Sequence, residues 1–414
     1  MRSYARGARI LSVGVAITGL VTFAFFSLAS HALSEVDYKG ISLLWSVMFL
    51  VISLIYRPVE QLLARTIALE RAQGRSGGHP LRVAMTIQLA FAALFVVVAL
   101  ALRDRVVNEV FDGSETLYWV LVVGVLAYAA SYFARGWLAG HQRFGLWGGL
   151  VLMEALSRCL FALAAALGIA SGQGFVALGI AAAPLVSLVV VPLALRRRAS
   201  AGEQEEAPGD LTLRGGAGFA GAVLVVMAAE QALLNGPILI VDATSADAAL
   251  AGFAFNVLLI TRAPLQLFQA IQTTLLPHLS GLSGTGAEAG FRDALRRILG
   301  AVAGFTLLVV AVLAIAGPWA MGILFGGDFD YGRAGLVCVG LGMGFHLAAG
   351  TLNQAALARG RAAAAATAWL AAAALFLGWL ALSPLHDALL AVEVGYAGSV
   401  ALLAAALWSI ERSG

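Results

Sequence analysis

The sequence predicts an all-α, polytopic membrane protein of about twelve transmembrane helices. Three observations predict this class: 61% of the 414 residues are hydrophobic, only 12% are charged, and long apolar stretches recur along the whole chain. Within hydrocarbon every backbone polar group must be bonded inside the span, and a helix achieves this with its own residues. The composition therefore excludes an ordinary soluble domain.

Each expected span is an apolar stretch of roughly the 20 residues that a helix needs to cross a bilayer. Six spans precede a polar gap in the chain and six follow it. In order, they are residues 10–30, 41–60, 82–102, 117–139, 148–170, 174–195, 216–240, 249–275, 295–317, 333–357, 361–383 and 388–410.

The first span has an alternative interpretation as a cleaved signal peptide. Three arginines precede it, and small residues close it at Leu28 to Ala32. Its apolar run is long for a signal sequence, and the second half of the chain contains a counterpart of it. We therefore expect it to remain as a transmembrane helix.

The basic residues indicate the orientation of the spans in the membrane, because they gather in alternate loops. With a cytoplasmic N-terminus, 20 of the 26 lysines and arginines fall on the cytoplasmic side, four fall outside and two lie within spans. This asymmetry follows the positive-inside rule and predicts that both termini are cytoplasmic. The net charge of +3 is spread between loops and forms no long basic stripe, so no nucleic-acid partner is expected.

A polar stretch and an internal sequence repeat divide the chain into two halves. Residues 196–215 lack apolar periodicity and predict a cytoplasmic linker between an N-terminal lobe of six spans, residues 1–195, and a C-terminal lobe, residues 216–414. A shift of 205 residues aligns Arg57 with Arg262, within the stretches YRPVEQL (56–62) and TRAPLQL (261–267). Two copies of a six-helix bundle share one orientation, an arrangement that places a transport pathway between them.

The aligned arginines predict a binding site for an anion. Arg262, Gln266 and Gln269 are spaced by four and three residues, so they share one helical face, and the second span offers Arg57 and Gln61 at the same spacing. A polar face within hydrocarbon is costly unless it lines a water-filled cavity. Paired guanidinium groups suit a phosphate or diphosphate. The alternative is that both arginines extend to the cytoplasmic interface as topology markers.

Three further charged residues within spans are candidates for a cavity or a coupling role. Glu154 and Arg158 lie four residues apart, which predicts an ion pair along one helix, with a cavity role as the alternative. Glu230 has no basic partner on its own helix. It is expected either to carry a coupling proton or cation, or to bond to a neighbouring helix.

No cofactor, metal site or catalytic residue is expected. The pattern Asp328-Phe329-Asp330 imitates the metal-binding DxD of glycosyltransferases, but it falls in an expected outer loop and the chain has no nucleotide-binding α/β domain. His79, His141 and His278 lack metal-ligand spacing. The chain also lacks a P-loop, so it is not expected to be an enzyme or an ATPase.

Several motifs resemble the polysaccharide-transport branch of the multidrug/oligosaccharidyl-lipid/polysaccharide exporter superfamily. The resemblance covers nearly the whole chain, although each motif is degenerate. Its motifs are the Arg-Pro and Arg-x-Pro turns at Arg57 and Arg262, RGWLAGHQRF (135–144), LPHLS (276–280) and LFG (324–326).

The resemblance implies a MATE-like fold and a flippase for lipid-linked oligosaccharides, of the Wzx type, in the cell (plasma or inner) membrane. Such a protein moves a polyprenyl-diphosphate-linked sugar to the outer leaflet by alternating access, for cell-surface polysaccharide biosynthesis. The cavity arginines then receive the diphosphate, and the expected partners are the lipid-linked anionic saccharide, membrane lipids, a coupling cation (proton or sodium) and glycan-assembly enzymes.

Three alternatives remain. A multidrug exporter of the same superfamily, coupled to protons or sodium, gives Glu230 the central role. A membrane-embedded glycan polymerase or ligase needs a large outer catalytic loop, and no stretch between the expected spans has that length. A membrane scaffold does not account for the polar face that carries Arg262.

Overall fold

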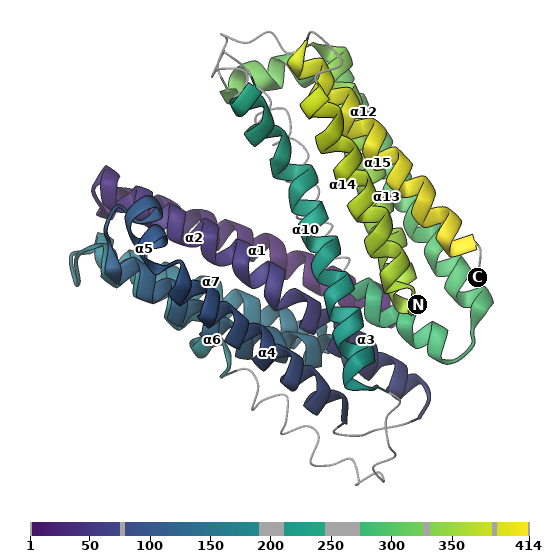
Figure 1. Cartoon of the computed structure of the whole chain (residues 1–414), viewed down its shortest axis with the longest axis horizontal. Coiled ribbons are helices and arrows are strands. Elements are labelled where there is room, and N and C mark those ends of the chain that lie inside the picture. The colour runs from purple at the N-terminus through teal and green to yellow at the C-terminus, as the bar shows by residue number, and fades with distance from the viewer. Residues whose placement is uncertain are drawn as a thin grey trace. The chain divides into compact units, whose positions relative to one another are not determined.

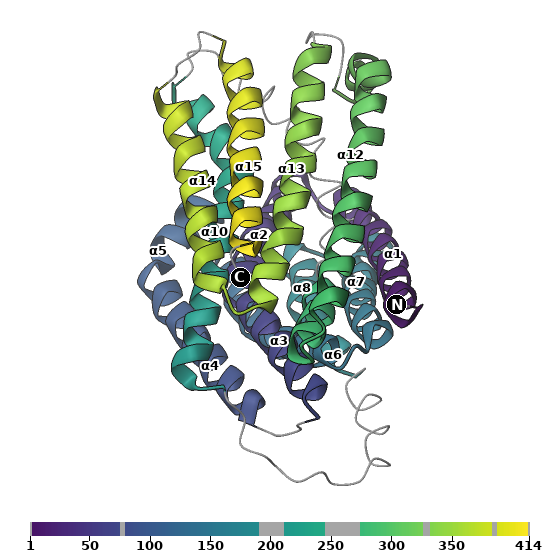
Figure 2. The same ribbon diagram turned by 90° about the vertical axis from the view of Figure 1, so that its right-hand side faces the viewer.

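The computed structural model describes residues 2–74, 79–189, 211–244, 274–325, 332–382 and 387–412. Secondary structure in these ranges is helical throughout (Figures 1 and 2). Nine of the described helices are long and apolar enough to cross a membrane by length and composition, and two shorter apolar helices cover Ile17–Ala32 and Gln173–Ser187. The expected class, an all-α polytopic membrane protein, is confirmed.

The chain separates into two compact units, Met1–Ala220 and Gly221–Gly414. The division falls within one helix, a little beyond the expected linker at 196–215. Most of that linker and most of the expected span at 249–275 lie outside the described residues. The division into lobes at 1–195 and 216–414 stays a prediction.

Unit 1 is built from long helices, which Figure 1 colours from purple to blue. A short helix α5 (Arg103–Arg105) and a π-helical turn η1 (Val106–Val110) follow α4. The long helices are α1 (Arg2–Ala32), α2 (Glu35–Ile55), α3 (Arg57–Ala72), α4 (His79–Ala101), α6 (Glu115–Gly140), α7 (Phe144–Ala166) and α8 (Gln173–Ser187).

The expected second span, 41–60, is broken at Tyr56, which ends α2 and begins α3. Pro58 follows in the first turn of α3, where a missing backbone N–H costs nothing because that turn has no intrahelical acceptor. The Tyr56 side chain is fully buried. The sequence places Arg57 and Gln61 near the end of one helix, whereas the structure places them in the first turns of a new one.

Close helix packing in unit 1 depends on glycines of α6. A β-carbon at Gly136 would lie 2.9 Å from the Glu60 carbonyl oxygen, and one at Gly140 would lie 2.7 Å from Cβ of Ile67. These two glycines are four residues apart, so they form one flat strip on the face of α6 that α3 approaches. The backbones of α3 and α6 therefore pack against each other directly.

Unit 2 contains most of α10 (Leu213–Thr244), a helical stretch over 274–284, and four long helices shown in green to yellow in Figure 2. These four are α12 (Glu288–Phe325), α13 (Arg333–Ala358), α14 (Ala362–Leu382) and α15 (Ala388–Arg412). The glycine-rich stretch Gly340 to Gly344 of α13 packs closely against its neighbours. A β-carbon at Gly342 would lie 2.8 Å from the Tyr396 ring, and one at Gly344 would overlap the Thr306 side chain.

Candidate functional site

The main polar network of unit 1 centres on Glu154 of α7. Its carboxylate lies 2.5 Å from a guanidinium nitrogen of Arg135 on α6 and accepts hydrogen bonds from Ser131 at 2.5 Å and Ser187 at 3.4 Å. The Glu154 side chain is 2% exposed. The Arg135 guanidinium also lies over the Tyr132 ring, 4.5 Å from its centroid. A buried charge is tolerable only when paired and hydrogen-bonded, and this one has both kinds of partner.

Glu60 is a second buried carboxylate, one turn into α3. Its Oε1 accepts a hydrogen bond of 3.1 Å from the indole of Trp147 on α7. Arg135 lies close enough to act electrostatically on Glu60. The two glutamates and Arg135 therefore join α3, α6 and α7 through one set of charges.

Arg158 of α7 is buried, with 3% of the residue exposed. It donates a hydrogen bond of 2.8 Å to the Tyr128 hydroxyl, and its guanidinium lies 4.6 Å from the Trp45 ring centroid and 5.8 Å from that of Phe49. The expected pair along α7 with Glu154 is wrong, because Glu154 bonds across to α6 instead. Sequence spacing shows which side chains share a helical face, but not what the neighbouring helix brings to it.

Arg57 and Gln61, two of the expected substrate-binding residues, are brought together on α3 as their spacing implied. The Gln61 carbonyl oxygen is buried without a hydrogen-bond partner among the described residues. Their expected counterparts Arg262, Gln266 and Gln269 lie outside the described residues. The paired-arginine cavity stays a prediction.

Unit 2 contains a polar cluster around His346 of α13. Its Nδ1 lies 3.1 Å from the Tyr396 hydroxyl of α15, and its Nε2 lies 3.6 Å from a carboxylate oxygen of Glu230 on α10. The Trp369 ring of α14 packs against the imidazole with centroids 5.5 Å apart. The sequence offers Glu230 no basic partner on its own helix. The structure supplies one from α13, which is His346.

Sequence reasoning missed Arg135, Trp147 and His346 as members of these networks. The sequence assigns Arg135 to a cytoplasmic helix end, although the structure buries it. His346 sits in the middle of an expected span, and an ionisable group at such depth is itself a signal that could have identified it. Trp147 carried no signal, because aromatic residues are common near the ends of membrane helices.

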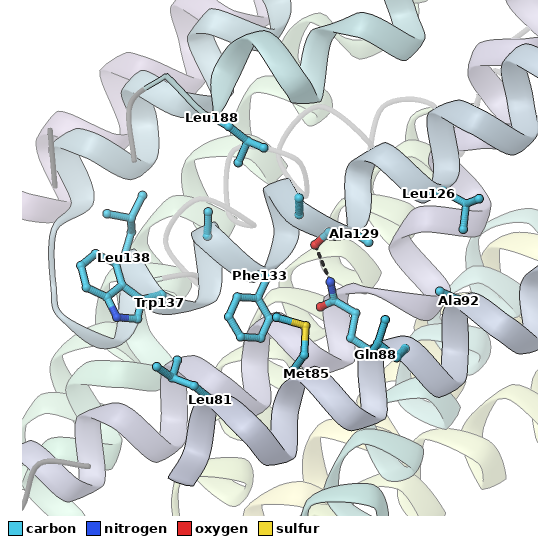
Figure 3. A pocket seen from close by; sticks show the side chains of 13 residues that line it. Leu81, Met85, Gln88, Ala92, Leu126, Ala129, Phe133, Trp137, Leu138 and Leu188 are labelled. Carbon is cyan, nitrogen blue, oxygen red and sulfur yellow. Dashed lines mark hydrogen bonds between the residues drawn. The ribbon is translucent and has the colours of Figure 1, made fainter. Parts of the chain in front are cut away.

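An apolar groove lies on unit 1 between α4 and α6 (Figure 3). It has a volume of about 480 Å³, and the side chain of Gln88 reaches across its floor to donate a hydrogen bond of 2.5 Å to the Ala129 carbonyl. The groove is lined by Leu81, Met85, Gln88, Leu89, Ala92, Leu126, Ala129, Ala130, Phe133, Ala134, Trp137, Leu138 and Leu188. Within the described ranges no three His, Cys, Asp or Glu side chains are grouped to hold a metal ion.

Comparisons with known proteins identify the fold. No protein-family model matches the chain, and no curated protein matches it in sequence. Its structure is similar to that of a MATE protein in the bent conformation, with a TM-score of 0.82, 12% identity, and 99% of this chain and 94% of that chain covered.

Two further solved structures are similar over nearly their full length. The bent form of the Vibrio cholerae MATE transporter VcmN has a TM-score of 0.73 at 16% identity, covering 100% of this chain and 98% of that one. The MATE transporter ClbM in complex with Rb⁺ has a TM-score of 0.79 at 17% identity, covering 99% and 94%. The expected MATE-like fold is confirmed.

Proposed function

We propose that this protein is an exporter that moves a polyprenyl-diphosphate-linked oligosaccharide from the inner to the outer leaflet of the cell membrane by alternating access. The observation that supports the proposal is Arg158. It is buried within the apolar helix α7, and its hydrogen-bond and ring partners, Tyr128, Trp45 and Phe49, are uncharged. A cation in that position is costly and favours an anionic cargo over a cationic one.

The chemistry of the cargo fits such an interior. A hydrated sugar diphosphate cannot enter hydrocarbon unaided, because each unpaired polar or charged group costs several kcal/mol there. The prenyl tail is already soluble in the bilayer. A transporter therefore needs a polar path for the head alone, and basic side chains along the path lower the cost of the diphosphate.

The roles proposed for single residues follow from their environments. Arg57 and Gln61, together with Arg262, Gln266 and Gln269, receive the diphosphate. Arg158 supplies a further cavity charge. Glu154 is committed to Arg135 at 2.5 Å, so its role is to position that arginine rather than to contact the cargo.

The test is a flipping assay in vesicles that contain the purified protein and a fluorescent lipid-linked oligosaccharide. We expect Arg57→Ala and Arg262→Ala to abolish transfer between leaflets while leaving insertion and folding intact. Arg103→Ala is the matched control, because Arg103 is partly exposed and pairs with exposed Glu115 at a helix end. Undiminished flipping by both cavity variants would refute the assignment.

A second candidate, a cation-coupled multidrug exporter, is favoured by Glu230. Its carboxylate lies 3.6 Å from Nε2 of His346, so an acidic and a basic side chain from two helices meet inside unit 2. For this function Glu230→Gln should abolish uptake of a cationic dye driven by a proton or sodium gradient. Asp293→Asn is the control, since it makes the same carboxylate-to-amide change at an exposed ion pair with Arg297 on α12. Dye transport without oligosaccharide transfer would select this candidate.

Glycan-assembly enzymes remain proposed partners at the cytoplasmic loops. The polymerase or ligase alternative receives no support from the comparisons, because the similar structures are described as transporters. We therefore propose that this protein is a transporter and not an enzyme.

A further inference from the structure

The groove between α4 and α6 runs along one half of the predicted membrane thickness. On α4 its lining extends from Leu81, near the start of the helix, to Ala92. Eleven residues of helix rise about 16 Å, close to half of a hydrocarbon core of about 30 Å. Figure 3 shows Leu81, Trp137 and Leu138 at one end of the groove and Ala92 and Leu126 at the other.

The lining of the groove is almost entirely apolar. Three of the lining residues on α6, Ala129, Ala130 and Ala134, have small side chains. Gln88 bonds α4 to α6 across the floor, which fixes the distance between the helices at that point. All other lining side chains are apolar.

Arginines lie beside the groove at the C-terminal end of α6, although none of them is among its lining residues. Trp137 lines the groove, and the guanidinium of Arg143 lies 5.4 Å from its ring centroid. Arg71 donates a hydrogen bond of 3.4 Å to the Gly140 carbonyl at the end of α6, and exposed Arg82 follows Leu81 on α4. The predicted topology places this end at the cytoplasmic leaflet, where a tryptophan beside arginines matches the headgroup level.

We propose that this groove binds the polyprenyl tail of a lipid carrier, with the carrier's phosphate held by the basic end at Arg143. The inference rests on the proposed function, because it identifies where the carrier's tail lies while its head is in the cytoplasmic leaflet. Charge complementarity selects a phosphate-headed lipid over a neutral one. The apolar lining suits the hydrocarbon tail of such a lipid.

The test measures binding of polyprenyl phosphate to the purified full-length protein by native mass spectrometry. Ala130→Phe fills the groove at an open position, and Ala134→Leu does so independently. Ala93→Phe is the matched control, since Ala93 is exposed on α4 and does not line the groove. We expect both filling variants to weaken binding about tenfold, equivalent to about 1.4 kcal/mol, while Ala93→Phe binds like the wild type.

A second arm separates the head from the tail. Arg143→Gln should weaken binding of polyprenyl phosphate but not of the neutral polyprenol, which lacks the phosphate. Phosphatidylglycerol tests the other occupant. If it displaces polyprenyl phosphate at equal concentration, or if Ala93→Phe loses as much binding as Ala130→Phe, the groove holds ordinary bilayer lipid and the proposal is wrong.

The two proposals fail in different ways. If wild-type protein binds polyprenyl phosphate in the groove but does not flip the lipid-linked oligosaccharide in vesicles, the proposed function fails and the groove stands as a lipid site. If flipping depends on Arg57 while the filling variants leave both binding and flipping unchanged, only the groove is excluded.

Discussion

At the scale of single residues, three glutamates of the described helices have partners on other helices. Glu154 bonds to α6, Glu60 accepts from α7, and Glu230 approaches α13. Each interaction ties two helices together at a depth where water cannot compete. Removing one side chain of such a pair therefore leaves the other without a replacement partner.

Arg135→Gln tests the contribution of such a partner at the buried ion pair between Arg135 and Glu154. The substitution leaves the Glu154 carboxylate buried without its cation, a change that typically costs about 3–5 kcal/mol. We expect a large fall in the unfolding temperature in detergent. Arg103→Gln is the control and should cost about 1 kcal/mol or less, because its ion pair with Glu115 is exposed.

A double variant separates lost pairing from lost packing. Arg135→Met combined with Glu154→Gln removes both charges together, so it should be less destabilised than Arg135→Gln alone. A double variant as unstable as the single one would contradict the pairing account.

Arg158→Lys tests the aromatic contacts of the second buried arginine. Lysine keeps the charge but cannot present a flat guanidinium to Trp45 while donating to Tyr128. We expect a loss of about 0.5–2 kcal/mol in unfolding free energy, seen as a lower unfolding temperature. Trp45→Phe should lose less, because it keeps an aromatic face. If Arg158→Lys is as stable as the wild type, the ring contacts contribute nothing.

At the scale of the elements, α3 meets α6 at the strip formed by Gly136 and Gly140, where α6 has no side chains. Gly136 faces backbone atoms of Glu60, and backbone cannot rotate away as a flexible side chain can. The break at Tyr56 lies four residues before Glu60, so the close contact with α6 falls at the start of α3.

Gly136→Ala should therefore push α3 from α6 and destabilise the protein by about 1–3 kcal/mol. Gly149→Ala on α7 is the matched control, because nothing lies within 4 Å of a β-carbon there. That control should be neutral or more stable by up to about 1 kcal/mol, since alanine favours a helix more than glycine does. Thermal unfolding of the two variants side by side measures the difference, and equal stability would exclude the close contact.

At the scale of the whole molecule, the distribution of basic residues predicts the orientation in the membrane. Reporter insertions at residue 203 and after residue 412 should report the cytoplasmic side, and an insertion at Gly113 should report the outer side. The reverse pattern would place the basic end of the α4–α6 groove in the outer leaflet. The groove could not then receive a carrier from the cytoplasm.

The sequence could predict part of the candidate site but not its pairing. Arg57 and Gln61 both lie on α3, and their four-residue spacing puts them on one face of it, because helical periodicity is a local property. The same spacing wrongly paired Glu154 with Arg158. The partner of Glu154 is 19 residues away on α6, and no local rule connects the two positions.

What the sequence by itself determined is membrane residence, the all-helical class and most helix positions. These follow from the length and apolar character of each stretch, which act on one helix at a time. Only the tertiary structure decided the break at Tyr56, the partner of Glu230 and the groove beside Gln88. Each of these depends on which faces of helices distant in the chain come together, and packing between helices fixes those faces.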